Sequence, residues 1–429
     1  MNERVFIHVD INSAYCSMEA FWNPELANKA IVVLSSNDGN IIARNAEAKK
    51  LKIPMGVPVF QVQDIIHANN VAVLSSNFAL YGEMSRRFHS ILAKYVAPES
   101  YYIYSIDEAF LEITDYMMLY DVSLLANELK TKIKKYIGLD TCVGAGRSLT
   151  EAKLANHLAK KKAEFNGICN LISMDPLDVE QLYLNMDVSE VWGIGSKYSK
   201  KLHAMGIATV LDLASANPNR MRDLFNVNIQ STILELQGNS CFPFESAPKA
   251  KQQIISSKSF GQKVTELVLL QEAISKYAQN ALSRLHSEKA LCGTIIVFLQ
   301  SNPFDRSKPY FNKSMTFSFP EPTDSILEVV KMATVLIEDM YKPDIEFKKC
   351  GIMLCDLIAE KHRTNDLLTD LSLIEKNNSL KKTYIEIQSK FGRNKIAAGS
   401  CNMKNRLWSP KSERASRNYF TEEGMIVFN

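Results

Sequence analysis

Residues 102–114 most constrain what this chain can fold into, because two adjacent acids, Asp107 and Glu108, interrupt an otherwise mostly apolar stretch. Residues 101–104 and 109–113 are rich in β-formers, which predicts two strands that meet at the acids. Successive side chains on a strand point to opposite faces, so neighbouring acids converge on one point only where the chain turns or bulges. The stretch therefore indicates either an ordinary solvated acidic turn or a hairpin that aims two carboxylates at one site.

A second apolar run, residues 5–9, ends in Asp10 and predicts a buried strand with this acid near its end. Residues 98–128, around the acid pair, hold seven acids and no Lys or Arg. Carboxylates without a local cation favour an added ion, and Mg²⁺ prefers oxygen ligands of this kind. Together with Asp107 and Glu108, Asp10 completes a set of three carboxylates that can hold two Mg²⁺ ions about 4 Å apart.

Four motifs then point to one family. Asp-Ile-Asn-Ser-Ala-Tyr at 10–15 and Ser-Ile-Asp-Glu-Ala at 105–109 resemble the two catalytic motifs of the Y-family translesion DNA polymerases. Residues 41–49 and 191–195 are similar to the UmuC branch of that family, which contains the catalytic subunits of bacterial DNA polymerase V. The resemblance covers nearly the whole chain, and chance agreement of all four motifs in this order is negligible.

The resemblance implies an α+β multidomain fold, arranged as a right-hand polymerase with a palm, small fingers, a helix-hairpin-helix thumb and an α/β little finger. The glycines of 192–195, ahead of a helix, suit a helix-hairpin-helix that grips a DNA backbone without reading bases. Strand-like and helical segments between 254 and 354 suit the little finger. The expected domains are the palm (1–12 and 76–166), the fingers (13–75), the thumb (167–240), the little finger (241–355) and a C-terminal tail region (356–429).

The implied reaction is template-directed nucleotidyl transfer at two Mg²⁺ ions. By resemblance, Asp10 and Asp107 would bridge the ions and Glu108 would bind the catalytic one. The carbonyl of Ile11 would complete the ion on the nucleotide side. One ion would lower the pKa of the primer 3′-OH and the other would neutralise the leaving pyrophosphate.

The incoming dNTP is the implied substrate, and further residues would bind it. The ring of Tyr15 would lie under the deoxyribose as a steric gate against a 2′-OH; packing in the palm core is the alternative. Lys160 would contact the triphosphate, although basic residues are also common at helix C-termini because of the dipole. Lys49 stands where DinB-type relatives have Arg, so it can neutralise but not orient the triphosphate, and Arg44 would supply the planar group.

Composition limits the class of protein. At 429 residues, the chain is too long for one core, and 46% apolar with 23% charged residues is typical of soluble globular proteins. Eight Cys without a Cys-x-x-Cys pair predict reduced thiols and no zinc site. No apolar run approaches the roughly 20 residues that span a bilayer, and residues 1–4 do not begin like a signal peptide. We therefore expect a cytoplasmic protein without membrane contact.

The net charge of +3 hides an uneven distribution. Residues 379–418 carry ten basic and two acidic side chains, a local charge of +8, whereas residues 98–128 carry −7. An acidic centre with basic outlying segments suits an enzyme that holds metal ions in one place and a polyanion in others. The alternative for the basic segment is a solvated surface.

The resemblance also implies partners: primer-template DNA, a processed UmuD dimer and a RecA filament. Family members often bind the sliding clamp through a short peptide, but the matching residues 364–368 are degenerate here, since they lack the Gln and the final aromatic residue. The expected function is error-prone translesion synthesis in the SOS response. A DinB-type translesion polymerase, a nucleotidyl cyclase and a non-catalytic DNA-binding repair factor are the alternatives.

Overall fold

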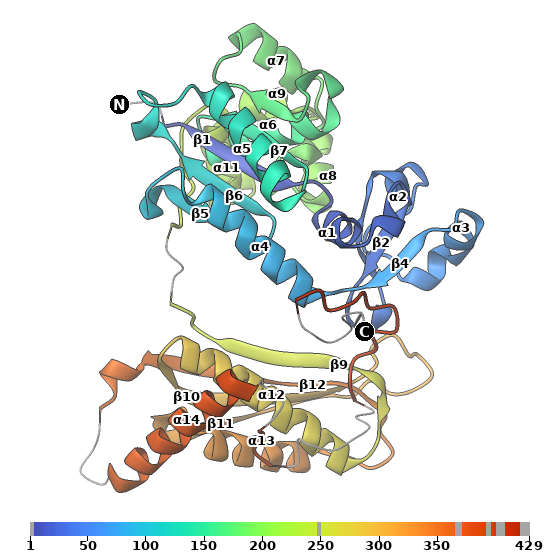
Figure 1. The fold of residues 1–429 in the computed structure, drawn as a ribbon, viewed down its shortest axis with the longest axis vertical. Coiled ribbons are helices and arrows are strands. Elements are labelled where there is room, and N and C mark those ends of the chain that lie inside the picture. Colours follow the sequence, from blue (N-terminus) through green and yellow to red (C-terminus); the bar gives the residue numbers. More distant parts are fainter. Residues whose placement is uncertain (1–3, 247–249, 365–370, 392–395, 400–407, 421–429) are drawn as a thin grey trace, which may run out of the picture. The chain divides into compact units, whose positions relative to one another are not determined.

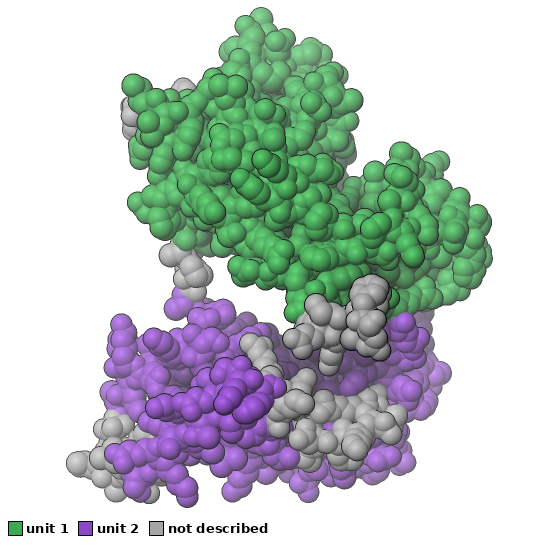
Figure 2. Space-filling model, in the orientation of Figure 1, with its two compact units in different colours: residues 1–35, 39–248, 414–429 green, residues 36–38, 249–413 purple. Residues whose placement is uncertain are grey.

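The structure is a computed structural model that describes residues 4–246, 250–364, 371–391, 396–399 and 408–420. The chain forms two compact units, shown in different colours in Figure 2. The first unit comprises residues 1–35, 39–248 and 414–429, and the second comprises residues 36–38 and 249–413. We describe each unit by itself.

A sheet with the strand order β5-β6-β1-β7-β8 forms the centre of the first unit (Figure 1). Its central strand, β1, pairs antiparallel with β6 on one side and with β7 on the other, and all six of its residues are buried. The predicted strand ending in Asp10 and the predicted hairpin are both present. The strands are β1 (Phe6–Ile11), β5 (Tyr101–Ile103), β6 (Glu108–Glu112), β7 (Thr141–Gly146) and β8 (Ile168–Asn170).

The two faces of β1 are buried in different ways. Ile7 and Val9 face the main core, to which α4 (Phe78–Leu92) and α5 (Val122–Ile137) contribute their apolar sides. Phe6 packs on the opposite face against α6 (Leu149–Lys161). Because side chains alternate along a strand, His8 and Asp10 share the α6 face with Phe6.

Helix α6 lies unusually close to the sheet because β7 has glycine beneath it. A Cβ atom at Gly144 would lie 2.1 Å from the backbone nitrogen of Asn156 and 2.3 Å from the carbonyl oxygen of Ala152. Only glycine leaves room for this approach. The Asn156 amide then donates to the Cys142 carbonyl at 2.6 Å, which fixes α6 to the strand beside β1.

A smaller sheet, ordered β3-β2-β4, and short helices make up the segment predicted as fingers. The strands β2 and β3 are antiparallel, and β2 and β4 are parallel. Strand β4 was not predicted. The elements are β2 (Ile31–Leu34), β3 (Ile41–Arg44), β4 (Ala72–Ser75), α1 (Ala14–Trp22), α2 (Ala46–Lys50) and α3 (Gln63–Ala68).

Helices with an apolar core of their own follow in the segment predicted as the thumb. Gly193 and Gly206, which lie in the turns on either side of α8, have φ values of 87° and 81° that favour glycine. This arrangement of helices joined by glycine turns agrees with the helix-hairpin-helix pattern. The helices are α7 (Pro176–Leu184), α8 (Ser196–Ala204), α9 (Val210–Ala214), α10 (Pro218–Leu224) and α11 (Val227–Leu236).

The second unit is built on an antiparallel sheet with the order β11-β10-β12-β9. Helices α12 and α13 cover one face and supply much of its core. All of these elements were predicted, although the strands are longer than expected. They are β9 (Ile254–Val264), β10 (Ala290–Ser301), β11 (Asn312–Thr323), β12 (Phe347–Ala359), α12 (Leu267–Ser287) and α13 (Ile326–Met340).

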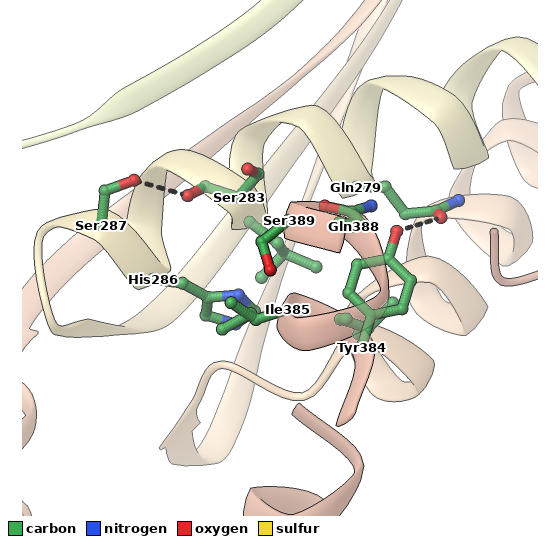
Figure 3. Close-up of a pocket in the computed structure, with 10 residues that line it drawn as sticks. Gln279, Ser283, His286, Ser287, Tyr384, Ile385, Gln388 and Ser389 are labelled. Atoms are coloured by element: carbon green, nitrogen blue, oxygen red, sulfur yellow. Dashed lines mark hydrogen bonds between the residues drawn. The ribbon is translucent and has the colours of Figure 1, made fainter. Parts of the chain in front are cut away.

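Helix α14 (Leu371–Phe391), which the sequence did not predict, packs on α12. The Tyr384 hydroxyl donates to Oε1 of Gln279 at 3.0 Å, and the two helices border a cavity of about 300 Å³ (Figure 3). Trp408 also joins this core and donates to Glu272 at 3.0 Å. Residues 356–429, predicted as one tail region, are thus divided between the two units.

Two sequence predictions can be placed only in part. Of the degenerate clamp peptide 364–368, all but Thr364 lies outside the described residues. No helix in the described ranges is long and apolar enough to cross a membrane.

Candidate active site

Backbone pairing brings the predicted carboxylates together at the end of β1. Asp10 lies directly opposite Glu108 in the antiparallel β1–β6 ladder. The next amide, that of Ile11, donates to the carbonyl oxygen of Asp107 at 3.0 Å. The amides of Tyr104 and Ser105 both donate to the Glu108 carbonyl, at 3.1 and 3.0 Å, and close the turn between β5 and β6. The backbone of the hairpin therefore brings Asp107 and Glu108 to the end of β1.

The tightest cluster of possible metal ligands among the described residues contains His8, Asp10 and Glu108, whose ligand atoms lie within 4.8 Å of one another. Asp107 is not part of this cluster: its Oδ1 accepts from the Ser105 hydroxyl at 2.6 Å. Sequence analysis missed His8. The signal was its position two residues before Asp10, which places both side chains on one face of a strand.

His8 is a neutral neighbour of the acids. Its Nε2 lies 4.0 Å from Oε2 of Glu108, and neither ring nitrogen has a hydrogen-bond partner within the described part of the chain. Burial lowers the pKa of His8 well below its ordinary value, and the charge of Lys153 lowers it further. His8 therefore adds no positive charge near neutral pH.

Two lysines of α6 neutralise the acids instead. Nζ of Lys160 lies 2.5 Å from Oδ1 of Asp10, and Nζ of Lys153 lies 2.9 Å from Oε2 of Glu108. Lys160 was predicted to contact triphosphate, whereas Lys153 was missed. A spacing of seven residues places both on one face of a helix, so the predicted Lys160 could have indicated Lys153.

The pKa values of the two acids shift in opposite directions, although burial acts on both in the same way. Burial raises the pKa of Asp10 above its usual range, and Lys160 only partly offsets this. Burial also opposes ionisation of Glu108, but the hydrogen bond from Asp10 and the charge of Lys153 together lower its pKa. Two carboxylates in one buried site favour the uptake of a proton or a cation. These hard oxygen ligands fit a divalent metal ion.

Most of the predicted site residues line one cavity of about 370 Å³. It is lined by the predicted residues Asp10, Ile11, Tyr15, Arg44, Lys49, Asp107 and Lys160. Glu108 instead lines an adjoining cavity of about 200 Å³ with His8, Lys153, Asp10 and Lys160. Since Asp10 and Lys160 line both, the acids stand between two hollows rather than at the bottom of one.

The residues predicted to bind nucleotide come from four different elements, with Lys160 on α6 as described above. The ring of Tyr15, on α1, stacks on Tyr81 of α4 with centroids 4.3 Å apart and an interplanar angle of 11°. Burial raises the pKa of Tyr15, so its hydroxyl is neutral. Arg44, at the end of β3, donates from Nη1 to the carbonyl oxygen of Ile53. Lys49 lies in the last turn of α2.

Comparison with known proteins identifies the family of this chain. Residues 9–157 match the impB/mucB/samB family, and residues 251–367 match the C-terminal domain of the same family. The chain belongs to the impB/mucB/samB family. The first match contains the three predicted carboxylates, and the second contains the sheet of the second unit.

Named relatives cover most of this family member. Protein MucB of Salmonella typhimurium is 36% identical over 360 residues, which are 83% of this chain and 84% of the relative. Protein UmuC of Salmonella typhimurium strain LT2 is 33% identical over 418 residues, 97% of this chain and 98% of the relative. DNA polymerase IV of Oceanobacillus iheyensis is 25% identical over 408 residues, 92% and 91% of the two chains.

Solved structures show the same fold. A Y-family DNA polymerase chimera of Dbh and Dpo4 aligns with a TM-score of 0.64 at 22% identity, over 83% of this chain and 99% of its own. The insertion ternary complex of Dbh DNA polymerase aligns over the same shares, with a TM-score of 0.56 and 21% identity. The predicted α+β multidomain polymerase fold is confirmed.

These findings also confirm the predicted branch and enzyme class. The chain is a Y-family DNA polymerase of the UmuC type, a DNA-directed enzyme of translesion synthesis. The UmuC and MucB relatives are more similar to it than the DNA polymerase IV relative, so the UmuC branch is favoured over the DinB-type alternative.

Proposed function

We propose that this polymerase extends a DNA primer past damaged bases by two-metal nucleotidyl transfer at Asp10, Asp107 and Glu108. The observation that carries the proposal is the register of β1 and β6, which sets Asp10 opposite Glu108 and ties Ile11 to Asp107. This register brings Asp10 beside the adjacent pair Asp107 and Glu108 at the end of β1, and the Asp10 and Glu108 carboxylates lie closest together. The wider setting, error-prone synthesis in the SOS response, is supported by the similarity to the UmuC and MucB proteins.

The donor set fits two Mg²⁺ ions, with Asp10, Asp107, Glu108 and the Ile11 carbonyl as the residues that would hold them. When bound, such ions activate the primer hydroxyl and neutralise the leaving pyrophosphate. Lys153 and Lys160 now neutralise carboxylates that would bind metal. We infer that Lys160 exchanges Asp10 for the triphosphate when nucleotide enters, because both an acid and a phosphate attract the same ammonium group.

The cavity of about 370 Å³ is the proposed site for the dNTP. Arg44, Lys49 and Lys160 supply its positive charge. Tyr15 lines the same cavity as Asp10, and its ring stacks on the Tyr81 ring. A ring fixed in this way can exclude a 2′-hydroxyl by contact, which supports its role as the steric gate.

We also propose how this chain binds DNA and which partners it has. The glycine turns around α8 allow a close approach of backbone amides to phosphates, which supports a sequence-independent grip by the proposed thumb, 167–240. We keep the predicted palm, fingers, little finger and tail boundaries as part of the proposal. The processed UmuD dimer, the RecA filament and the cytoplasmic location are also proposed, on the similarity to UmuC.

Primer extension with Mg²⁺ tests the central proposal, on an undamaged template and on one with an abasic site. Asp107→Asn with Glu108→Gln should abolish extension on both templates while primer-template binding in a gel shift stays near the wild-type level. The matched control is Glu99→Gln with Asp115→Asn, which removes the same charge from exposed positions of the same acidic segment. Extension by the Asp107/Glu108 variant at the control's rate would refute the assignment.

A further inference from the structure

The C-terminal strap, which we define as residues 414–420, lies on the first unit at the edge of the small sheet (Figure 1). Its first residue, Arg414, bonds to Ser75 at the end of β4. The Arg414 amide donates to the Ser75 hydroxyl at 3.0 Å, and the Arg414 carbonyl accepts from the Ser75 amide at 2.9 Å. The two bonds fix where the strap begins.

The next contact is with the cap of α4. Oδ1 of Asn77 accepts from the amide of Leu80 at 3.1 Å and so caps the helix. The other half of the same amide group, Nδ2, donates to the Ser416 hydroxyl at 2.9 Å and to the Arg417 carbonyl at 3.1 Å. One side chain thus joins the start of α4 to the middle of the strap.

The end of the strap is anchored by rings. Tyr419 stacks on Trp22 of α1, with centroids 5.4 Å apart, and Phe420 meets the same indole edge-on at 5.2 Å. The guanidinium of Arg87, on α4, lies 5.2 Å from the centroid of the Phe420 ring. Both strap aromatics are partly buried against the main core. The strap therefore contacts α1 and α4 together.

A buried carboxylate connects the strap to the proposed nucleotide site. Glu19 of α1 is fully buried, and its Oε1 accepts from the Tyr81 hydroxyl at 2.7 Å. Burial raises the pKa of Glu19, and the hydrogen bond from Tyr81 lowers it in part. Its Oε2 has no hydrogen-bond partner within the described residues, but Ser416 and Tyr419 of the strap lie close enough to interact with this carboxylate electrostatically. The ring of Tyr81 in turn stacks on the ring of Tyr15.

We propose that the C-terminal strap is a positioning element for sugar selection: through Trp22, Glu19 and Tyr81 it holds the Tyr15 ring flat against the wall of the dNTP cavity. The proposal rests on the proposed function, in which Tyr15 excludes the 2′-hydroxyl. A contact gate works only if its ring cannot move aside, and the strap contacts both α1 and α4, the helices that carry the two stacked rings. Residues about 400 positions from Tyr15 would then help to choose between deoxyribose and ribose.

The test measures single-nucleotide insertion of dCTP and of CTP opposite a template G, under the conditions in which the wild-type enzyme extends primers. The strap variant is Tyr419→Ala with Phe420→Ala, and Tyr15→Ala is the reference. Tyr136→Ala, an exposed tyrosine on α5, is the matched control. Circular dichroism and thermal unfolding are recorded for each protein.

We expect the ratio of kcat/KM for dCTP over CTP to fall by about a hundredfold in Tyr15→Ala and by about tenfold in the strap variant. Insertion of dCTP by the strap variant should change much less than the ratio. Tyr419→Phe, which keeps the ring, should restore the wild-type ratio, and Tyr136→Ala should not alter it. Tyr81→Phe keeps the stack but loses the bond to Glu19, so its ratio should fall less than that of the strap variant.

A folded strap variant with the wild-type ratio overturns the positioning role, and so does an equal loss of dCTP and CTP insertion. In either case a large effect of Tyr15→Ala leaves the proposed function standing. An unchanged ratio in Tyr15→Ala would refute the proposed gate role of Tyr15 and, with it, the positioning role of the strap. If the strap variant does not fold, Ser416→Ala replaces it: a smaller fall in the ratio supports the proposal, and an unchanged ratio overturns it.

Discussion

The central sheets of the two units differ in which side chains they bury. In the first unit, β1 is buried along its whole length, yet it carries His8 and Asp10. In the second unit, the strands β9 to β12 contain no buried charged residue, and their buried polar side chains are Ser and Thr. Burying a carboxylate costs free energy unless it is paired, whereas an apolar interior stabilises directly.

The open face of the second sheet completes the contrast. Ile295, Val297 and Leu299 of β10 pack toward α12 and α13. The alternate residues, such as Phe298, and Lys349 of β12 point away from these helices, and the Lys349 ammonium lies 5.7 Å from the Phe298 ring. One sheet thus carries titratable side chains on its central strand, beside the cavities of the candidate active site, and the other offers an outer face that suits binding.

The largest effect is expected at the lysine that neutralises Asp10. Lys160→Ala should lower kcat/KM for dNTP insertion by about ten- to a hundredfold, because a charged contact to the triphosphate is lost. Lys161→Ala is the control, since its Nζ pairs with Glu190 at 2.6 Å and not with the site acids. Steady-state insertion kinetics measure both. Equal effects of the two variants would mean that general charge, and not the position of Lys160, matters.

A smaller effect is expected on the open face of the second sheet. Lys349→Ala should weaken primer-template binding a few-fold and reduce the slope of log affinity against log salt by about one, as for a lost phosphate contact. The rate at saturating DNA should change little. Lys331→Ala, an exposed lysine on α13, should leave the salt slope unaltered. Fluorescence anisotropy at several salt concentrations decides, and a kcat defect without a binding defect would contradict the division of roles.

The smallest effect concerns the cost of a buried acid away from the sheet. Burial raises the folded-state pKa of Glu19 above its ordinary value of 4.5, so the folded protein favours the protonated form. The stability due to that proton is present below pH 4.5 and is lost as pH rises toward the folded pKa. Cys16, Tyr81 and Tyr419 nearby have raised pKa values and stay neutral in this range.

Glu19→Gln cannot ionise and still offers an oxygen to Tyr81. Its Tm relative to wild type should therefore increase between pH 5 and pH 8. Glu180→Gln, at an exposed position of α7, should show no such trend. Differential scanning fluorimetry at each pH gives the comparison, and a constant offset for Glu19→Gln would show that this carboxylate does not resist ionisation.

Sequence patterns were sufficient for elements with strong periodicity. The apolar run before Asp10, the hairpin at Asp107 and the strands and helices of residues 254–354 appear where they were expected. The pairing of Asp10 with Glu108 cannot be predicted from periodicity. It depends on strand register, which no local pattern specifies; the sequence indicated only that the three acids can form one metal-binding set, and the family resemblance then assigned them to one site.

What was missed has physical reasons. β4 and β8 are only four and three residues long, so no alternation develops. The basic composition of the tail hid α14, whose position depends on contacts with α12. His8 and Lys153 were overlooked because each indicates a functional role only through its spacing from a second residue. That residue is Asp10 for His8 and Lys160 for Lys153. The bond between Asn77 and Ser416 joins positions 339 apart, and no sequence pattern reports such a pair.

The central position of β1 has a consequence for how the enzyme loses activity. Its backbone is paired on both sides and no residue of the strand is more than 7% exposed, so its amides can exchange with solvent only when the five-stranded sheet opens as a whole. Fraying of outlying segments would leave the Asp10 carboxylate in place. Heat inactivation of catalysis should therefore coincide with deuterium uptake at His8 and Asp10, and not with the earlier uptake at peripheral helices.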